Sequence, residues 1–241
     1  MALSKDYSYL FGGSSVAIHG EEVVMTLSPE MQYIDFHTHW AGCEKYLNDD
    51  SVIVVQSLHL QEAMHPRANY ITIGVHPMLP GASDIVQQYR KTPEKILSEW
   101  SDRINNSSTP IIAIGECGWD NRSPLSAEAQ NQLVDFQVQL ALLLRLPMVF
   151  HIVGGWHYLL KKHQEATTPW IVHGFRGKSQ LANQLTEAGI FLSLHPLSPE
   201  PPNNNYLLET DDSSNHVRDQ YQSRGANCEE KFNLFSNLFL T

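Results

Sequence analysis

Short apolar runs, each bounded by turn or polar residues, recur along the whole chain. They are rich in Val and Ile and apolar on both faces, which is typical of parallel strands buried between a core and covering helices. The eight runs are YIDFH (33–37), SVIVVQSL (51–58), YITIGVHP (70–77), IIAIGE (111–116), PMVFHIV (147–153), WIVHGF (170–175), GIFLSL (189–194) and YLLETD (206–211). The pattern therefore predicts eight parallel strands.

Helical spacing appears between several of these runs. Over residues 126–146, Leu133 and Phe136 belong to an apolar stripe that recurs on one helix face. Ser126 can cap the first turn of this helix, and Pro147 ends the pattern. Shorter patterns predict further helices over residues 92–104, 178–189 and 227–239. Strands that alternate with helices form a parallel sheet, and eight of them predict an α/β fold of the (β/α)₈ TIM-like barrel type.

Two connections between the predicted strands carry little helical signal. Residues 59–69 lack an apolar stripe, and residues 195–205 are rich in Pro and Asn. An extended segment spans roughly 3.3–3.6 Å per residue, so a short link can return along a barrel strand without a helix. We therefore expect a distorted barrel with some crossover helices shortened or missing. This single domain would occupy residues 31–241, after an N-terminal extension over residues 1–30 in which residues 16–27 resemble a short hairpin.

Composition and charge narrow the classes of function. Apolar residues make up 42% of the chain and charged residues 17%, as in an ordinary globular protein. The formal net charge of −10 argues against binding nucleic acid through a broad basic surface. The three cysteines lack CxxC spacing, and the chain shows neither a signal-peptide pattern nor a membrane-length apolar run. We expect a cytoplasmic protein with no membrane contact and no obligate protein partner.

Coordinating side chains stand where the predicted strands end. Two histidines at i and i+2 share one face of a strand, which places His37 beside His39. In a barrel, the carboxyl ends of all strands meet at one mouth, where barrel enzymes carry their chemistry. The six residues at these ends are His37, His39, Glu116, His151, His173 and Asp211. So many polar groups in a partly buried mouth would be costly unless divalent cations paired with them, so the set predicts a metal site.

Each of these residues also has an ordinary structural explanation. A single histidine in a core strand commonly serves as a hydrogen-bonded structural residue, and Asp211 or Asp212 could cap a following helix. The shared position at the strand ends favours the metal site over these separate explanations. His76 ends the third strand and could touch substrate, and His195 has a similar place on the seventh. Cys117 is expected to be a packed core thiol.

The motifs, in their order and spacing, resemble those of the TatD-type metal-dependent hydrolases, described as deoxyribonucleases among the amidohydrolase-like barrels. The resemblance covers about residues 33–240 and rests on DFHTHW, IGVHP, AIGECGWD, FHIV, VHGFRG and LLETDD. It implies a hydrolase with a binuclear metal centre. One ion would be held by His37, His39 and Asp211, and the second by His151 and His173, with Glu116 bridging the two.

The resemblance also implies that Asp211 orients or deprotonates the attacking water, so Asp211 and Glu116 are the expected catalytic residues. Imidazole and carboxylate ligands accommodate zinc, manganese, magnesium or nickel, and the sequence does not select among them. One departure concerns the substrate. Where the family has Ser and Arg after the strand 5 histidine, this chain has Ile152 and Val153, so an arginine that could meet a phosphate is missing. Arg176, in GFRG, could approach the same mouth.

Three functions fit these observations. The first is a two-metal phosphodiesterase of the deoxyribonuclease type, acting through a metal-activated water on DNA ends, short single-stranded DNA or small phosphodiesters. The second is a barrel amidohydrolase acting on amides or lactones, against which Glu116 counts, since many of those enzymes have a modified lysine there. The third is a metal-binding protein with weakened or lost catalysis, as the missing arginine allows.

Overall fold

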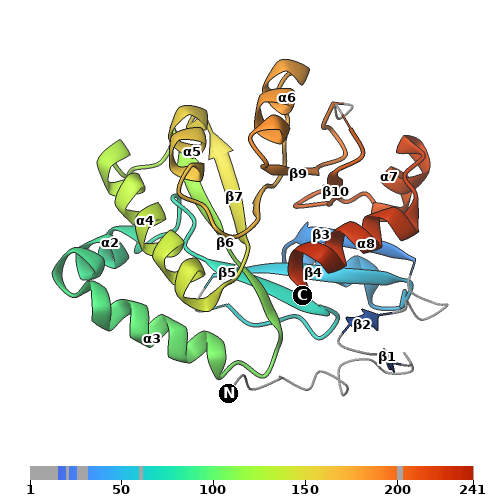
Figure 1. The fold of residues 1–241 in the computed structure, drawn as a ribbon, viewed down its shortest axis with the longest axis horizontal. Helices are drawn as coiled ribbons and strands as arrows, with labels where there is room; N and C mark the ends of the chain where they lie inside the picture. Colours follow the sequence, from blue (N-terminus) through green and yellow to red (C-terminus); the bar gives the residue numbers. More distant parts are fainter. Residues whose placement is uncertain (1–15, 20–21, 26–31, 60–61, 200–202, 241) are drawn as a thin grey trace.

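The computed structural model describes residues 16–19, 22–25, 32–59, 62–199 and 203–240. Its centre is a sheet of eight parallel strands whose spatial order follows the order of the chain (Figure 1). The strands are β3 (Tyr33–Thr38), β4 (Val52–His59), β5 (Tyr70–Gly74), β6 (Ile111–Asp120), β7 (Met148–Val153), β8 (Trp170–Val172), β9 (Phe191–Leu194) and β10 (Tyr206–Leu208). Each predicted run overlaps one of them, which confirms the predicted strands.

The sheet curls into a nearly closed barrel. Its two edge strands, β3 and β10, meet at a parallel bridge between Thr38 and Asp211. Below that bridge the buried carboxylate of Asp35 ties the same edges together. It accepts hydrogen bonds from the Tyr46 hydroxyl at 2.7 Å and from the Thr210 backbone N–H at 2.8 Å. The predicted TIM-like barrel is therefore confirmed, and its seam is closed by side chains as well as by backbone.

Helices cover the outside of the barrel and one end of it (Figure 1). They are α1 (Trp40–Cys43), the 3₁₀ helix η2 (Glu44–Tyr46), α2 (Ala82–Lys91), α3 (Pro93–Asn105), α4 (Ala127–Leu144), α5 (Trp156–His163), α6 (Ser179–Glu187), α7 (Val217–Arg224) and α8 (Cys228–Phe239). The four predicted helices correspond to α3, α4, α6 and α8. Helices α2, α5 and α7 are short, bury three residues or fewer each and were not predicted. The described parts of residues 59–69 and 195–205 contain no helix, as expected.

The core has two layers, separated by the alternation of side chains along each strand. In β4, Val54 packs toward the outer helices, whereas Ile53 and Val55 face the barrel interior. The interior layer is completed by α8, whose Phe235 and Phe239 are buried in it. Helix α8 therefore fills the interior beneath the mouth, and the opposite ends of the strands remain for polar side chains.

Strands β1 (Val16–His19) and β2 (Glu22–Met25) pair antiparallel, as the hairpin pattern of the N-terminal extension predicts. The rest of that extension, residues 1–15, 20–21 and 26–30, lies outside the described residues. Among the described residues, no helix has both the length and the apolar character needed to cross a bilayer.

Candidate metal centre

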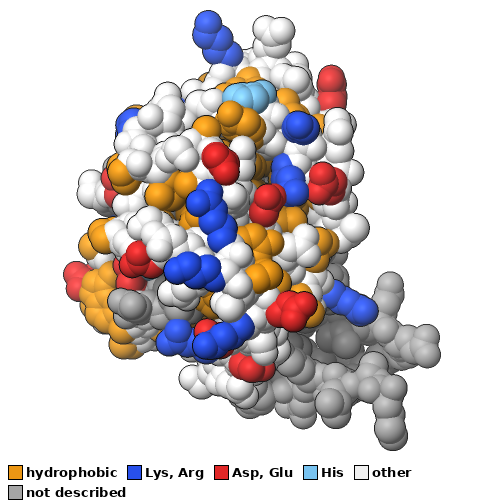
Figure 2. All heavy atoms as spheres, turned by 90° about the vertical axis from the view of Figure 1, so that its left-hand side faces the viewer, with side chains coloured by type: hydrophobic (Ala, Val, Ile, Leu, Met, Phe, Trp, Pro, Cys, Tyr) orange, Lys and Arg blue, Asp and Glu red, His pale blue; other side chains and the backbone are white. Residues whose placement is uncertain are grey.

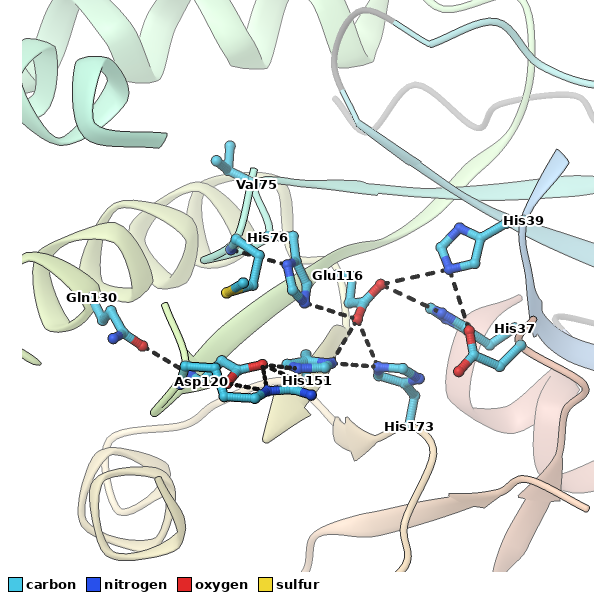
Figure 3. Close-up of polar contacts among 12 residues, drawn as sticks. His37, His39, Val75, His76, Glu116, Asp120, Gln130, His151 and His173 are labelled. Atoms are coloured by element: carbon cyan, nitrogen blue, oxygen red, sulfur yellow. Dashed lines mark hydrogen bonds and ion pairs between the residues drawn. The ribbon is translucent and has the colours of Figure 1, made fainter. Parts of the chain in front are cut away.

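The six residues proposed from the sequence lie together at the carboxyl ends of the strands. Figure 3 shows Glu116, which lies within β6, with imidazoles from other strands directed toward its carboxylate. His37 lies on β3 and His39 directly follows it, and their rings are 5.3 Å apart, as expected for side chains at i and i+2. His37 also stacks on His173, with ring centroids 4.1 Å apart, so residues from opposite sides of the barrel seam meet here.

The two oxygens of the Glu116 carboxylate face two different sets of side chains. Oε2 lies 3.6 Å from Nε2 of His37 and 4.0 Å from Nε2 of His39. His39 in turn is 3.3 Å from Oδ1 of Asp211. Oε1 lies 2.7 Å from Nε2 of His173 and 2.9 Å from Nδ1 of His151. This division is the geometry that a carboxylate needs if it is to bridge two cations.

The charges of the cluster compensate one another. Burial alone would raise the pKa of Glu116, but the charge of His173 and a hydrogen bond from its ring hold that pKa well below its usual value. Burial would likewise lower the pKa of His173, yet Glu116 raises it well above the ordinary histidine value. Asp211 is also partly buried, and its hydrogen bond with His39 keeps its pKa below the normal aspartate value. Both carboxylates therefore stay ionised at neutral pH.

Two further carboxylates orient the imidazoles, and sequence reasoning did not find them. Buried Asp120 accepts from Nε2 of His151 at 3.0 Å, which leaves Nδ1 to face Glu116. The carboxylate of buried Glu209 lies 3.4 Å from Nδ1 of His173. This contact leaves Nε2 of His173 to face Glu116. Such carboxylates fix the tautomer and raise the basicity of metal-ligating histidines. A signal for Glu209 existed in the sequence, because it stands two residues before Asp211 within the predicted run 206–211.

The residues present fit divalent cations. His37 is fully buried, and neither of its ring nitrogens has a hydrogen-bond partner within the described residues. An unpaired buried polar group is costly, and coordination would satisfy it. Four sets of side chains place their ligand atoms within 4.8 Å of one another: His37, His39 and Asp211; His37, Glu116 and His173; His76, Glu116 and His151; and His173, Glu209 and Asp211. This nitrogen and oxygen donor set suits zinc, manganese or nickel.

His76 joins this cluster from the end of β5. Its Nδ1 accepts from the backbone N–H of Met78 at 3.1 Å, so its other nitrogen, Nε2, carries the proton. That N–H is directed at Oε1 of Glu116 from 3.4 Å (Figure 3). Burial lowers the pKa of His76 to about 4, which keeps the ring neutral. The structure therefore places His76 against the central carboxylate, and its contact with substrate stays a prediction.

Other sequence expectations have clear outcomes. The helix after Asp211 begins at Val217 with His216 as its N-cap, so the capping explanation for Asp211 and Asp212 is wrong. Cys117 is fully buried, and burial raises the pKa of its thiol well above the usual value, as expected of a packed core cysteine. Val153, which stands at the place of the missing arginine, is a partly buried apolar residue at the end of β7, and Ile152, at the place of the serine, is buried in the outer core.

A cavity of about 440 Å³ opens beside the cluster. It is lined by His39, Trp40, Ala41, Gln56, Ser57, Glu62 and Ala63. Trp40 is 47% exposed, which presents a large apolar ring next to His39. Ser57 is buried, and its hydroxyl has no hydrogen-bond partner within the described residues. The cavity thus combines an aromatic surface with an unpaired polar group next to the candidate metal ligands.

Comparisons with known proteins agree with this picture. A family model described as TatD related DNase matches residues 46–229, a span that begins after His37 and His39. The fold resembles that of YJJV, a TatD homologue from Escherichia coli, with a TM-score of 0.60 and 20% identity over 87% of this chain and 98% of that one. A TatD family hydrolase from Entamoeba histolytica gives a TM-score of 0.65 and 15% identity, over 88% of this chain and 99% of that chain.

A phosphotriesterase homology protein from Escherichia coli, solved with phosphate in its active site, gives a TM-score of 0.54 and 12% identity over 83% of this chain and 87% of that chain. At these identities the structural matches establish a shared fold. The family match, together with the clustered histidines and carboxylates, supports a metal-dependent hydrolase. The chain belongs to the TatD-related DNase family.

Proposed function

We propose that this protein is a divalent-metal-dependent phosphodiesterase that acts on DNA ends, short single-stranded DNA or small phosphodiesters. The observation that carries the proposal is the Glu116 carboxylate, whose two oxygens face separate sets of histidines. That arrangement suits two cations at the spacing used for phosphate ester hydrolysis, about 3.5–4 Å. Membership of the TatD-related DNase family supports the same reaction class.

When bound, divalent cations supply Lewis acidity, which neutralises charge on phosphate oxygens and acidifies water. The residues of the chain have separate tasks around them. Asp211, ionised and held by His39, is placed to accept the proton of the attacking water. Glu116 stays ionised and receives the Nε2–H of His76, which fixes the carboxylate in position. Asp120 holds the ring of His151 so that its Nδ1 faces the centre.

The surface of the protein favours small substrates or strand ends over long duplexes. The chain carries a formal net charge of −10. Figure 2 shows one face of the molecule, that of the left-hand side of Figure 1, on which Lys and Arg side chains lie among Asp and Glu side chains. Duplex binding draws its affinity from neutralising many phosphates, which mixed charges of this kind do not provide. The cavity beside His39, with exposed Trp40 in its wall, offers room for one base or a comparable apolar group.

The proposal is tested with the purified chain, stripped of metal and reloaded with Mn²⁺, Zn²⁺, Mg²⁺ or Ni²⁺. Cleavage of end-labelled oligonucleotides and of bis(p-nitrophenyl) phosphate is measured for the wild type and for Asp211→Asn. We expect the variant to be slower by roughly 10²- to 10⁴-fold, the size of a lost general base. Asp219→Asn is the matched control, because Asp219 is exposed on α7 and the charge change is identical.

Three results would contradict the proposal. A rate for Asp211→Asn equal to that of the wild type would remove Asp211 from the reaction. Hydrolysis of amides or lactones in a parallel panel, without hydrolysis of phosphodiesters, would favour the amidohydrolase alternative. Stoichiometric metal with no turnover on either panel would favour a metal-binding protein, which the apolar Val153 at the place of the missing arginine also allows.

A further inference from the structure

Three histidines that precede a proline adopt the same local turn. In each, Nδ1 accepts from the backbone N–H two residues later, at 3.1 Å: His65 from Arg67, His76 from Met78 and His195 from Leu197. A ring nitrogen that accepts a hydrogen bond carries no proton, so in the neutral ring the proton lies on Nε2. The turn therefore presents each Nε2–H as a donor in a fixed direction.

The three donors differ in what they meet. The Nε2–H of His76 is directed at Glu116, and the ring of His65 packs edge-on against Trp40 with centroids 4.7 Å apart. The Nε2 of His195 is buried and has no hydrogen-bond partner within the described residues. Oδ1 of Asp212 lies 3.9 Å from this Nε2, which is too long for a hydrogen bond. His195 is only 4% exposed. Its Nε2–H is therefore a buried donor that is held in a fixed direction and lacks an acceptor, which is energetically costly.

His195 stands at the mouth that holds the candidate metal ligands. It directly follows β9, which lies between β8 and β10, and these lead to His173 and Asp211. In β9, Leu192 and Leu194 pack toward the outer helices, whereas Phe191 packs against the interior layer. The two-residue alternation from Phe191 assigns His195 to the interior face, the face of the cluster.

A cation stands near this donor. Arg176 follows β8 and is exposed. The backbone N–H of Phe175 donates to the backbone oxygen of Ser193 at 3.1 Å, so Arg176 and His195 follow a point at which the ends of β8 and β9 lie side by side. Burial lowers the pKa of His195, and the charge of Arg176 acts in the same direction. Glu209, Asp211 and Asp212 act on the ring in the opposite direction. A phosphate group could accept a hydrogen bond from the Nε2–H of His195 and pair its negative charge with the guanidinium of Arg176.

We propose that His195 and Arg176 form a phosphate-binding subsite at the ends of β8 and β9, which takes over from the arginine that is absent after His151. His195 donates its Nε2–H to a phosphate oxygen of the substrate, and Arg176 adds charge at the open side. The identity of the ligand as a phosphodiester rests on the proposed function, whereas the anion site itself rests on the orphaned donor.

The test uses the metal-loaded full chain, freed of excess metal, and inorganic phosphate as the probe. Phosphate affinity is measured by isothermal titration calorimetry for the wild type, His195→Phe and His195→Gln. The Phe variant keeps a ring and loses the donor, so we expect a Kd about 10-fold higher or more. The Gln variant keeps an N–H near the place of Nε2, so we expect it to recover much of the affinity.

Arg176→Gln is expected to weaken phosphate binding several-fold, and Arg103→Gln, a charge change on α3, is the control and should not. Metal content and thermal unfolding are measured for every variant, so that a folding defect is recognised. With bis(p-nitrophenyl) phosphate, we expect His195→Phe to raise KM more than it lowers kcat, which a purely structural role would not do.

The outcomes separate this inference from the proposed function. Equal phosphate affinity for folded, metal-loaded wild type and His195→Phe would overturn the subsite, whatever the activity. Equal losses in His195→Phe and His195→Gln would also overturn it, because the donor would then not matter. A His195-dependent phosphate site in a chain that hydrolyses no phosphodiester would support the subsite and contradict the proposed function.

Discussion

At the level of single residues, the geometry of the candidate metal centre depends on carboxylates that bind the histidine ligands and do not themselves contact substrate. Asp120 is fully buried, and it is bound on one side by the guanidinium of Arg122 at 2.6 Å and on the other by His151 at 3.0 Å. Burial would raise the pKa of Asp120, but its hydrogen bonds with Arg122 outweigh this and hold the pKa below the usual value. The carboxylate therefore stays charged and fixes one tautomer of His151.

Asp120→Asn is expected to weaken metal binding by about 10- to 100-fold, because the amide no longer fixes the tautomer or the basicity of His151. The affinity is measured by competition with a chromogenic chelator under metal-limited conditions. Arg122→Gln is the matched comparison, since it leaves the contact between Asp120 and His151 in place and should have a smaller effect. Wild-type metal affinity in Asp120→Asn would show that Asp120 has no part in positioning the ligand.

The residues that the sequence identified are those at the ends of apolar runs, where the barrel topology alone brings them together. The sequence did not reveal Asp120, because β6 extends four residues beyond the predicted end at Glu116. Nor did it distinguish His195 from other histidines, because the decisive fact is the hydrogen bond of its Nδ1, which depends on the local turn. Hydrogen-bond direction is set by conformation, and residue type alone does not give it.

At the level of elements, the close approach of β6 to β7 sets the positions of Glu116, on β6, and His151, on β7, relative to each other. Gly118 has a φ of +138°, and a Cβ there would lie 2.1 Å from the backbone oxygen of His151. Because that neighbour is backbone, it cannot move aside without shifting the strand that carries the ligand. Glycine is therefore required at this position both for its conformation and for its lack of a side chain.

Gly118→Ala is expected to destabilise the fold by several kcal/mol, about the range of severe core changes. Gly225→Ala is the control, since Gly225 also has a positive φ, +58°, but a Cβ there meets nothing within 4 Å. That change should cost about 1 kcal/mol, the strain of a left-handed conformation alone. Urea unfolding compares the two, and equal losses would show that the close approach of β6 and β7 is unimportant.

Helix α8 carries a buried charge that makes stability depend on pH. Lys231 is 2% exposed, and its Nζ donates to the backbone oxygen of Asn204 at 2.6 Å and lies 3.3 Å from the ring centroid of Tyr206. Burial lowers the pKa of Lys231 to about 8 from its usual value of 10.5. Between pH 8 and 10.5, Lys231 is more often protonated in the unfolded chain than in the folded chain. The free energy of unfolding therefore rises with pH across this range.

Relative to Lys231→Met, the wild type should therefore gain about 1 to 3 kcal/mol of unfolding free energy as the pH rises from 8 to 10.5. Below pH 8 the difference between the two proteins should be constant. Urea unfolding of both proteins at a series of pH values gives this difference directly. A difference that does not change between pH 8 and 10.5 would show that Lys231 is solvated in the folded state.

Elements with a strong pattern could be predicted from the sequence, and those without one could not. The eight strands and α4 have continuous apolar faces, so burial alone specifies them. Helix α7 buries only Val217, Gln220 and Tyr221, and its position depends on tertiary contacts such as that of Tyr221 with the backbone of Ile34. Local pattern carries little information about an element that is held by so few contacts.

At the level of the whole molecule, net charge should decide how the protein meets nucleic acid. A protein that binds DNA through many basic residues loses affinity steeply as salt rises. With a formal net charge of −10, this chain should instead repel a long polyanion, and salt would screen that repulsion. We expect kcat/KM for an oligonucleotide to stay level or rise between roughly 50 and 200 mM salt.

The comparison substrate is bis(p-nitrophenyl) phosphate, whose single charge makes its kcat/KM less sensitive to salt. Short single strands should also be cleaved faster than duplexes of the same sequence, because only the mouth, and not the surface, attracts phosphate. A fall in kcat/KM for the oligonucleotide of about tenfold or more over this salt range would show that a basic surface binds the nucleic acid after all.

The central claim is that one carboxylate, Glu116, lies between two cations at the barrel mouth. The most direct test is an anomalous difference map from crystals of the full chain grown with Mn²⁺ or Zn²⁺. The account predicts two peaks, one near Oε2 with His37, His39 and Asp211, and one near Oε1 with His151 and His173. A map with no peak in contact with Glu116, in crystals saturated with metal, would contradict it.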